Sequence, residues 1–376
     1  MSPVGFYLHV PFCRRKCPYC DFYSIAREEG HAEQAAYVDA LEHELRTLPA
    51  DFKPQTVFIG GGTPTELATP LLARLLALLP QYIDLTDVQE WTCEANPGTF
   101  TTEKAQLLCE AGVNRLSIGA QSFQPSLLAF LGRIHGPDEI DAAAALARAT
   151  GFPALNLDLI HSVPGSTPAT LDADLDRVLA WSPEHIACYH LIIEEGTPFH
   201  RQRAQGTLQE LDDDRQFAQY ELARNRLREA GYTHYEISNF AKPGHKCRHN
   251  RLYWTGGAYI GCGPSAHSHW AGRRYANVRG LRPYLRHLRA GESPVSFSEE
   301  LDPAAKARET LVMQLRELEG VNRIAFQQLT GIDYHDLCGP AIDRLCRESW
   351  LQESNGHLRL TEKALFLSDA VMAELV

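Results

Sequence analysis

The chain has 376 residues, of which 44% are hydrophobic and 22% charged, and it carries a formal net charge of −11. These values are ordinary for a folded protein and exclude bulk disorder, while the acidic balance argues against general nucleic-acid binding, which needs a basic face. No apolar run approaches the roughly 18–20 residues that span a bilayer, and the N-terminal sequence lacks the features of a signal peptide. We therefore expect a cytoplasmic protein without a transmembrane segment, long enough for two domains.

Six short runs rich in β-forming residues recur up to residue 192, each followed by a polar or Gly/Pro turn. They are FYLHV (6–10), TVFIG (56–60), EWTCE (90–94), RLSIG (115–119), ALNLDLI (154–160) and HIACYHLI (185–192). Stretches with helical apolar spacing lie between them, at 35–48, 70–80, 139–150 and 169–181. This alternation is typical of β/α units around a parallel sheet, and it predicts an α/β fold with a partial (β/α) TIM-like barrel.

The chain changes character after about residue 200. A long polar helix is predicted over 211–231, and its aspartate triplet suits a solvated helix start. From about residue 300, helical patterns precede Asn355-Gly356, a strong two-residue hairpin signal, so we expect a small winged-helix-like α+β domain. That segment has eight Lys and Arg against twelve Asp and Glu, which makes it a poor reader of phosphates. The predicted boundaries are a barrel over 1–235, a connecting region over 236–300 and a C-terminal domain over 301–376.

Three of the ten cysteines cluster, Cys13, Cys17 and Cys20, with the spacing C-x3-C-x2-C. Structural zinc normally takes four ligands, and no second cysteine pair lies nearby. Three thiolates instead suit a cubane iron–sulfur cluster in which one iron has no protein ligand and stays open to a substrate. The spacing alone leaves zinc and coincidence as alternatives.

Polar and glycine-rich motifs fall where the predicted strands end, the edge at which α/β barrels build their sites. The turn Gly60–Pro64 follows TVFI, and its backbone can approach a ligand closely and present N–H groups to a carboxylate. Glu94, Gln121 and Asp158 lie at or near the ends of three further strands. A charged residue in a buried strand is costly unless it is paired or faces a ligand, so these side chains are candidate ligand contacts.

The cysteine motif with its following aromatic residues resembles the radical S-adenosylmethionine (SAM) superfamily. The segments FYLHVPFC, GGGTP, EANPGT, GVNRLSIGAQSF, LGRIH, NLDLI, YEISNFA and HNRLYW occur in the order found in one branch, the oxygen-independent coproporphyrinogen III oxidases and their relatives. The resemblance implies a 4Fe–4S cluster whose open iron binds SAM. By position it assigns the SAM contacts Tyr7, Tyr19, Gly61, Gly62, Thr63, Glu94, Gln121, Arg133 and Asp158. One departure is Ser162, which stands where glycine is usual and leaves the local turn uncertain.

Within this branch, the decarboxylating oxidases carry a further cysteine two residues after the third cluster ligand, where this chain has Phe22. The segment therefore resembles the HemW-type heme chaperones. HNRLYW matches a motif implicated in heme binding in that group, which implies His249 as an iron ligand with Tyr253 and Trp254 lining the pocket. A neutral imidazole is a good iron ligand and aromatic rings pack on a porphyrin.

His245, His267 and His269 are candidates for a second heme ligand, and the sequence does not choose among them. His9, in the first strand, is expected to be a hydrogen-bonded neighbour of the cluster rather than a ligand.

The resemblance implies a protein that binds heme and delivers it to a heme-requiring enzyme, plausibly respiratory and membrane-associated. Whether the chain is itself an enzyme stays open at this stage, as does homodimer formation. The alternative is anaerobic oxidation of coproporphyrinogen III to protoporphyrinogen IX. A tetrapyrrole methyltransferase or heme-degrading relative would share the first half, but this chain is short for that class.

Overall fold

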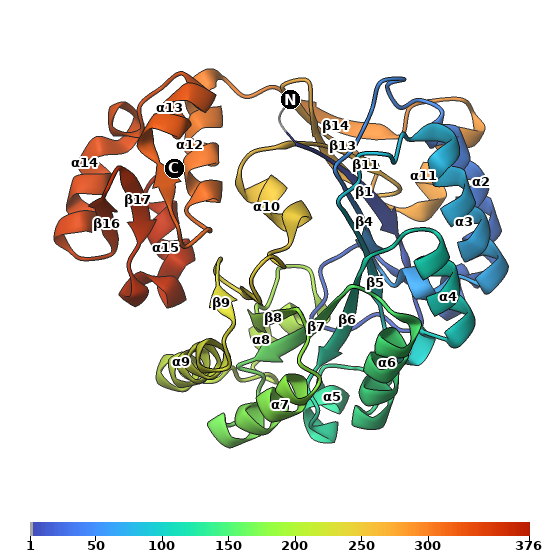
Figure 1. Cartoon of the computed structure of the whole chain (residues 1–376), viewed down its shortest axis with the longest axis horizontal. Coiled ribbons are helices and arrows are strands. Elements are labelled where there is room, and N and C mark those ends of the chain that lie inside the picture. The colour runs from blue at the N-terminus through green and yellow to red at the C-terminus, as the bar shows by residue number, and fades with distance from the viewer. Residues whose placement is uncertain (1–2) are drawn as a thin grey trace.

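The computed structural model describes residues 3–376, apart from the side chains of residues 29 and 30. Within this range the main sheet has twelve strands in the order β14-β13-β12-β11-β1-β4-β5-β6-β7-β8-β10-β9. Six neighbouring strands in its middle run parallel: β1 (Val4–Val10), β4 (Thr56–Gly61), β5 (Glu90–Ala95), β6 (Arg115–Gln121), β7 (Ala154–His161) and β8 (His185–His190). These coincide with the six predicted runs, and the sheet curves without closing, as a partial barrel does (Figure 1).

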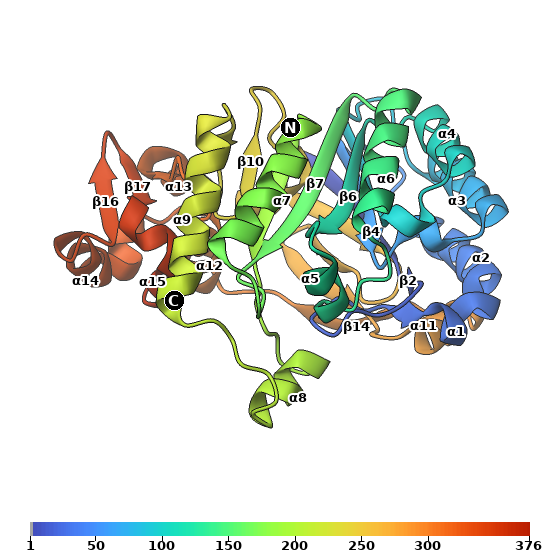
Figure 2. The same ribbon diagram turned by 90° about the horizontal axis from the view of Figure 1, so that it is seen from below.

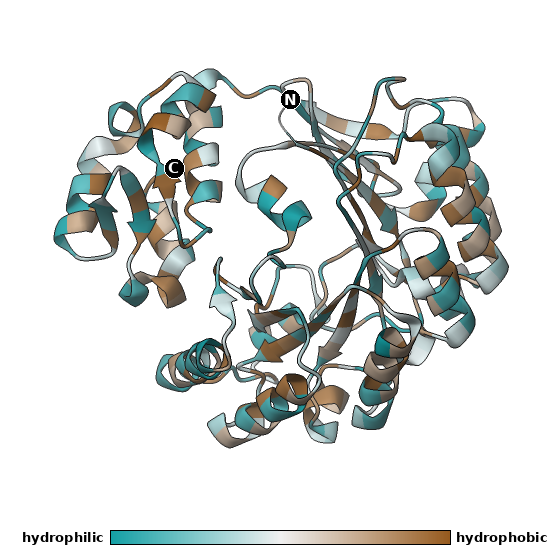
Figure 3. Cartoon of the chain, viewed as in Figure 1, coloured by the Kyte–Doolittle hydropathy of each residue, from teal (hydrophilic) through white to brown (hydrophobic). Residues whose placement is uncertain are grey.

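Helices cover the outer face of the parallel strands (Figure 1). They include α2 (Gln34–Leu45), α3 (Thr69–Tyr82), α4 (Thr102–Glu110), α5 (Pro125–Phe130), α6 (Pro137–Thr150), α7 (Pro168–Ala180) and α9 (Asp213–Glu229). The main hydrophobic core forms where their apolar faces meet the sheet, and Figure 3 shows the opposite faces as predominantly hydrophilic. Helix α9 begins as predicted, because the Asp212 side chain accepts a hydrogen bond from the Arg215 backbone N–H at 2.9 Å.

Short elements complete the carboxyl end of the barrel. They are β2 (Phe12–Cys13), β3 (Ile25–Ala26), α1 (Arg27–Gly30) and α8 (Pro198–Ala204). Strands β2 and β3 pair in parallel and enclose the loop with Cys17 and Cys20. Helix α8 projects from the barrel in Figure 2, and its Phe199 packs against Tyr19 of that loop.

The region after α9 extends both edges of the sheet. At one edge lie β9 (Thr233–His234) and β10 (Asn239–Ala241); at the other lie β11 (Ala258–Cys262), β12 (His267–Trp270), β13 (Arg273–Asn277) and β14 (Val295–Glu299), with α11 (Leu281–Arg289) between the last two. Helix α10 (Arg248–Trp254) lies between the barrel and the C-terminal part of the chain (Figure 1). It carries the HNRLYW motif.

The C-terminal part has its own hydrophobic core. Its elements are α12 (Pro303–Gln314), β15 (Val321–Asn322), α13 (Arg323–Thr330), α14 (Tyr334–Arg347), β16 (Leu351–Ser354), β17 (His357–Leu360) and α15 (Ser368–Ala373). The predicted hairpin joins β16 to β17, with Asn355 at φ 53° and Gly356 at φ 73°, the left-handed pair that a tight hairpin turn requires. Helices with a small antiparallel sheet agree with the expected α+β domain.

Among the helices of residues 3–376, none has both the length and the apolar composition needed to cross a membrane.

Candidate functional site

A cavity of about 1210 Å³ lies inside the barrel. Its wall combines inward-facing side chains of the parallel strands with the cysteine loop and helix α10. The residues predicted to contact the cluster and SAM, together with His249, lie on this wall: Tyr7, Cys13, Cys17, Tyr19, Cys20, Gly61, Gly62, Thr63, Glu94, Gln121, Arg133, Asp158 and His249. The fold therefore brings these residues together, whereas only His267 of the three candidates for a second heme ligand joins them.

The cavity runs along the barrel strands, with different chemistry at each end. The cysteine loop and the turn after β4 lie at the carboxyl ends. His249 contacts Thr56, the first residue of β4, whereas Gly61 is the last. At a strand rise of about 3.3 Å per residue, these levels are about 16 Å apart. The predicted cluster and heme residues thus occupy opposite ends of one cavity.

The cysteine loop brings its three thiols onto one part of the wall. The Cys20 backbone N–H donates to the Cys17 carbonyl at 3.2 Å, which closes a turn between them. Cys13 Sγ lies 3.6 Å from Thr63 Oγ1, and the Arg133 guanidinium donates to Cys17 Sγ at 3.6 Å. Burial, followed by the neighbouring Cys17 thiol, raises the pKa of Cys20 to about 11. Burial also raises the pKa of Cys13, so the Cys13 and Cys20 thiols stay protonated unless a positive centre binds among them.

The donor set fits an iron–sulfur cluster better than one metal ion. Among the described residues, no group of three or more His, Cys, Asp or Glu side chains is arranged to hold a single ion. A cubane cluster places each cysteine ligand on a different iron atom, so it suits thiolates distributed around a shared wall. Cys13, Cys17 and Cys20 would hold three irons, and the described residues offer no fourth thiol on this wall.

The glycine turn after β4 is packed against the cysteine loop. A Cβ on Gly62 would lie 2.8 Å from the carbonyl oxygens of Val10 and Phe12, so this close approach requires glycine. The Gly62 N–H donates to the Val10 carbonyl at 2.8 Å and the Thr63 N–H to the Phe12 carbonyl at 2.7 Å. We expected these N–H groups to face a ligand carboxylate, but in this structure they fix the cysteine loop.

Two carboxyl groups face the middle of the cavity. Burial, reinforced by the Asp158 charge, raises the pKa of Glu94 to about 8, and the Gly61 N–H donates to Glu94 at 3.2 Å. Burial raises the pKa of Asp158 to about 6, although Asn156 donates to it at 2.6 Å. Neither pairs with a cation at ion-pair distance among residues 3–376. Both are suited to bind hydroxyl or ammonium groups of a ligand.

Arg133 and Gln121 lie where β6 ends. The strand has an irregular register between Gly119 and Gln121, and Gln121 adopts φ 71°, an uncommon conformation for a side-chain-bearing residue. Arg133 donates to the Gly119 carbonyl at 2.8 Å as well as to Cys17. It therefore joins the end of β6 to the cysteine loop.

The tyrosines and His9 make defined contacts near the same end. Tyr7 Oη lies 3.0 Å from His9 Nδ1, and His9 Nε2 lies 2.8 Å from the Tyr23 carbonyl oxygen. Burial lowers the pKa of His9 to about 4, so this ring is a neutral, hydrogen-bonded neighbour, as predicted. Burial raises the pKa of both Tyr7 and Tyr19 well above the ordinary value, which keeps the phenols protonated.

Ser162 adopts the conformation that glycine would take at the turn after β7. Its φ is 61°, and its N–H donates to Gln219 Oε1 at 2.9 Å. Its hydroxyl lies 2.9 Å from His161 Nδ1. The departure from the family pattern therefore leaves the turn intact and adds a side-chain contact.

His249 is fully buried and both of its ring nitrogens are engaged. Nδ1 lies 2.9 Å from Thr56 Oγ1, Nε2 lies 2.7 Å from the Tyr253 hydroxyl, and the ring stacks on Phe58 at a centroid distance of 5.2 Å. Burial lowers its pKa to about 3, so the imidazole is neutral at pH 7. Iron could reach Nε2 only after the Tyr253 hydroxyl leaves it.

Glu90 positions the helix that carries His249. Its carboxylate accepts the backbone N–H groups of Arg248 and His249, both at 3.0 Å, and so satisfies the start of α10. The sequence analysis missed this contact, because no local pattern links residues about 158 positions apart.

Arg115, the first residue of β6, is a second group that the sequence analysis missed. It lines the cavity, is 5% exposed, and its Nε has no hydrogen-bond partner among the described residues. The rule that singled out Glu94, a charge within a buried strand, applies equally to Arg115 and would have found it.

The three candidates for a second heme ligand differ in which cavity they line. His267 lies on the walls of both this cavity and a smaller adjacent one, His269 lines only the smaller one, and His245 lines neither. Phe22 stands two residues after Cys20, where the oxidases carry a further cysteine, and its side chain is 65% exposed on the cavity wall.

Comparison with family models gives two matches. Residues 7–178 match the radical SAM superfamily, and residues 301–367 match the HemN C-terminal domain.

Curated proteins and one solved structure resemble the chain over nearly its full length. It is 32% identical to the heme chaperone HemW of Lactococcus lactis, covering 100% of this chain and 98% of the relative. It is 36% identical to the heme chaperone HemW of Escherichia coli, covering 98% and 97%. The structure of the Escherichia coli coproporphyrinogen III oxidase HemN superimposes with a TM-score of 0.87 at 22% identity, covering 100% of this chain and 90% of that one, which shows a shared fold.

Proposed function

The chain belongs to the HemW family of the radical SAM superfamily, and on that premise we propose that it is a heme chaperone that binds heme and releases it to a heme-requiring protein. Membership of the superfamily implies a 4Fe–4S cluster and SAM. The recipient of heme, plausibly a respiratory enzyme at a membrane, belongs to the proposal, as do a cytoplasmic location and a possible homodimer.

The proposed cofactor site uses the carboxyl ends of the strands. Cys13, Cys17 and Cys20 would hold the cluster, which together with SAM supplies one-electron chemistry when bound. Glu94 and Asp158 accept hydrogen bonds from hydroxyl or ammonium groups of SAM, because each carboxyl lies in the cavity without a cation partner.

Tyr7, Tyr19, Gln121 and Arg133 complete the proposed contacts. Arg133 offers positive charge next to Cys17 and thereby offsets negative charge that a cluster brings. Gly62 and Thr63 act by keeping the cysteine loop in place, as their backbone contacts indicate, whereas Gly61 donates its N–H to Glu94 and so positions that carboxyl group.

The observation that carries the heme proposal is the place of the HNRLYW motif. Helix α10 directs His249 into the same cavity that the cysteines line, next to Tyr253 and Trp254. A neutral imidazole is the form that ligates iron. Thr56 holds Nδ1 and leaves Nε2 as the ligating atom, once the Tyr253 hydroxyl has moved.

Three segments serve this proposal: the cofactor barrel over 1–235, the heme-binding region over 236–300 and a C-terminal domain over 301–376. The C-terminal domain is attached to the heme-binding region by charge pairs. Arg251 of α10 donates to both Glu317 oxygens, at 2.7 and 3.0 Å, and Lys246 pairs with Glu319 at 2.8 Å. A recipient docked on this domain would therefore lie next to the helix that carries His249.

The test is a heme titration of the anaerobically reconstituted protein, read by visible absorption, on the wild type and on His249→Ala. His43→Ala, a change of an exposed histidine on α2, is the matched control. Stoichiometric binding that only His249→Ala weakens supports the proposal.

A second aliquot receives coproporphyrinogen III and SAM. Formation of protoporphyrinogen without specific heme binding would overturn the proposal in favour of an oxidase.

A further inference from the structure

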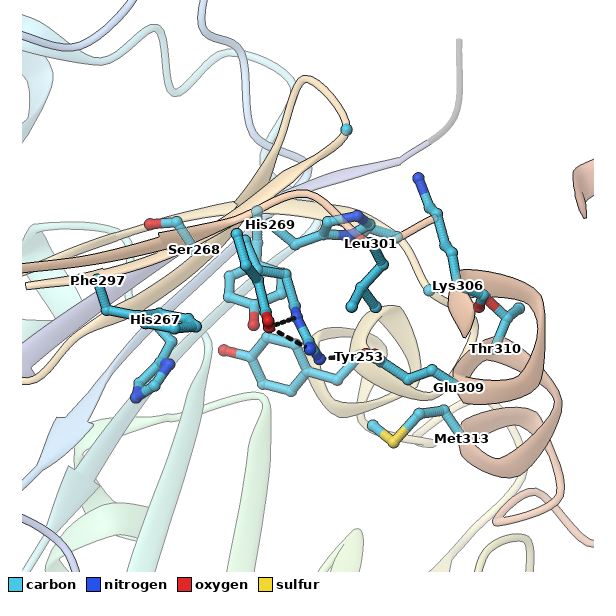
Figure 4. Close-up of a pocket in the computed structure, with 16 residues that line it drawn as sticks. Tyr253, His267, Ser268, His269, Phe297, Leu301, Lys306, Glu309, Thr310 and Met313 are labelled. Atoms are coloured by element: carbon cyan, nitrogen blue, oxygen red, sulfur yellow. Dashed lines mark hydrogen bonds and ion pairs between the residues drawn. The ribbon is translucent and has the colours of Figure 1, made fainter. Parts of the chain in front are cut away.

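A second cavity of about 620 Å³ lies between the extended edge of the sheet and helix α12. Figure 4 shows its two walls: His267, Ser268 and His269 come from β12 on one side, and Lys306 to Met313 come from α12 on the other. Its volume is in the range of ligand pockets, about 300–1,000 Å³. It is thus a site of suitable size outside the barrel interior.

Its lining combines polar side chains with aromatic and aliphatic ones. Tyr253, Tyr259, Phe297, Leu301 and Met313 supply the apolar surface. Tyr253 and Tyr259 pack edge to face with ring centroids 4.6 Å apart. Flat rings and a thioether suit a large planar apolar ligand, because ring faces and the polarizable sulfur offer apolar contact area.

The two cavities share part of their walls. Tyr253, Tyr259, His267 and Met313 line both of them. Tyr253 is also the residue whose hydroxyl engages His249 Nε2. A movement of the Tyr253 side chain would therefore expose His249 and widen the smaller cavity at the same place.

His267 is the histidine best placed at this shared wall. Its side chain is exposed, and no hydrogen bond to its ring is found among the described residues. An imidazole whose ring nitrogens carry no hydrogen bond is available to ligate iron. His269 instead has Nδ1 3.1 Å from the Gly257 carbonyl oxygen and lines only the smaller cavity.

The charged residues of the smaller cavity suit a ligand whose carboxylate groups remain exposed to solvent. Arg274 donates to Glu309 at 2.6 Å and also to Glu299, so these groups offset one another on the wall. Lys306 is exposed, on the α12 side. Porphyrin carboxylates placed near it would remain hydrated, which avoids the cost of burying them.

We propose that heme extends into this smaller cavity when the Tyr253 side chain is displaced, and that His267 would be the second iron ligand besides His249. This inference rests on the proposed heme-chaperone function. It assigns the binding site of the porphyrin and the second iron ligand.

The test uses the full-length reconstituted protein with ferric heme and compares wild type, His267→Ala, His269→Ala and His43→Ala. Two neutral imidazoles give six-coordinate low-spin iron, so we expect the wild type and the His43 control to be low-spin. We expect His267→Ala to give five-coordinate high-spin iron and at least about tenfold weaker binding, the loss that even indirect partners of metal ligands commonly cause. Resonance Raman and absorption spectra report the spin state independently of affinity.

A second variant tests whether the porphyrin occupies the smaller cavity, and it changes no histidine. Thr310 is 8% exposed on the α12 wall, and Thr310→Phe adds a ring to the smaller cavity. We expect heme binding to weaken while the circular dichroism spectrum and the cluster absorption stay unchanged.

The outcomes separate the two proposals. Heme binding with an unchanged low-spin spectrum in His267→Ala, or loss of the low-spin form in His269→Ala instead, would overturn this inference and leave the chaperone function standing. Unaltered heme binding by Thr310→Phe would overturn the assignment of the porphyrin to the smaller cavity. Absence of heme binding by the wild type would overturn both.

Discussion

Replacing Tyr253 with phenylalanine removes the one hydroxyl that occupies His249 Nε2. The Oη–Nε2 distance is 2.7 Å and His249 is fully buried, so iron can bind Nε2 only if this hydrogen bond breaks. A hydrogen bond of this kind contributes a net free energy of about 0.5–1.5 kcal/mol. The variant should therefore bind heme about 2- to 12-fold more tightly, since about 1.4 kcal/mol corresponds to a factor of ten.

Anaerobic titration of wild type, Tyr253→Phe and Tyr82→Phe with ferric heme would measure this. Tyr82, the last residue of α3, is on the wall of neither cavity, so Tyr82→Phe removes a hydroxyl away from His249 and should leave the affinity unchanged. Equal or weaker binding by Tyr253→Phe would refute the reasoning and indicate that the phenol itself contacts heme. Because the pKa of His249 is already lowered to about 3, protonation of this ring adds no pH dependence between pH 5 and 8.

Further predictions concern the carboxyl ends, the cluster and the C-terminal hairpin. Burial raises the pKa of Glu94 to about 8, so between about pH 4.5 and pH 8 the folded protein holds a proton on Glu94 that the unfolded chain loses. The Tm of the apoprotein should therefore fall as the pH rises to 8, and it should fall less steeply in Glu94→Gln. Equal slopes of Tm against pH for the two proteins, measured by calorimetry, would contradict this. Cys17→Ser should lose iron and sulfide after reconstitution, whereas Cys346→Ser, in the C-terminal part, should retain them. Gly356→Ala, at φ 73°, should destabilise the C-terminal part by about 1–2 kcal/mol in urea unfolding. Gly339→Ala, in α14 of the same part, should not, because a Cβ there would make only ordinary contacts at 3.5 Å or more.

The strands and the hairpin could be predicted because their signals are local. Alternating β-rich runs and helical spacing depend on neighbouring residues, and Asn355-Gly356 dictates its own turn. The added strands β11 to β14 carry weaker local signals, since they are short and lie among Gly, His and Arg. Their place in the main sheet depends on β11 pairing in parallel with β1, about 250 positions away.

The candidate site was predictable as a list of residues rather than as an arrangement. Charges within strands and the cysteine spacing indicated which side chains matter. They did not indicate that the Gly62 and Thr63 N–H groups fasten the cysteine loop, because those contacts depend on where Val10 and Phe12 lie in space. Glycine permits both close approach to a ligand and close approach to backbone, and only the fold distinguishes the two.

In the proposed function, cofactors and heme would use different parts of this cavity. The carboxyl ends carry polar groups suited to charged ligands, whereas His249 lies at the level of Thr56, about 16 Å along the strands, beside Tyr253 and Phe58, which suit an apolar ring. Glu90 and Thr56 fix His249 from the barrel, whereas Tyr253 also faces the cavity beside α12. A ligand entering from the α12 side would meet Tyr253 before His249, so the tyrosine controls access to the buried imidazole. The C-terminal domain supplies α12, so in the proposed function a recipient bound to this domain would lie close to one wall of the smaller cavity.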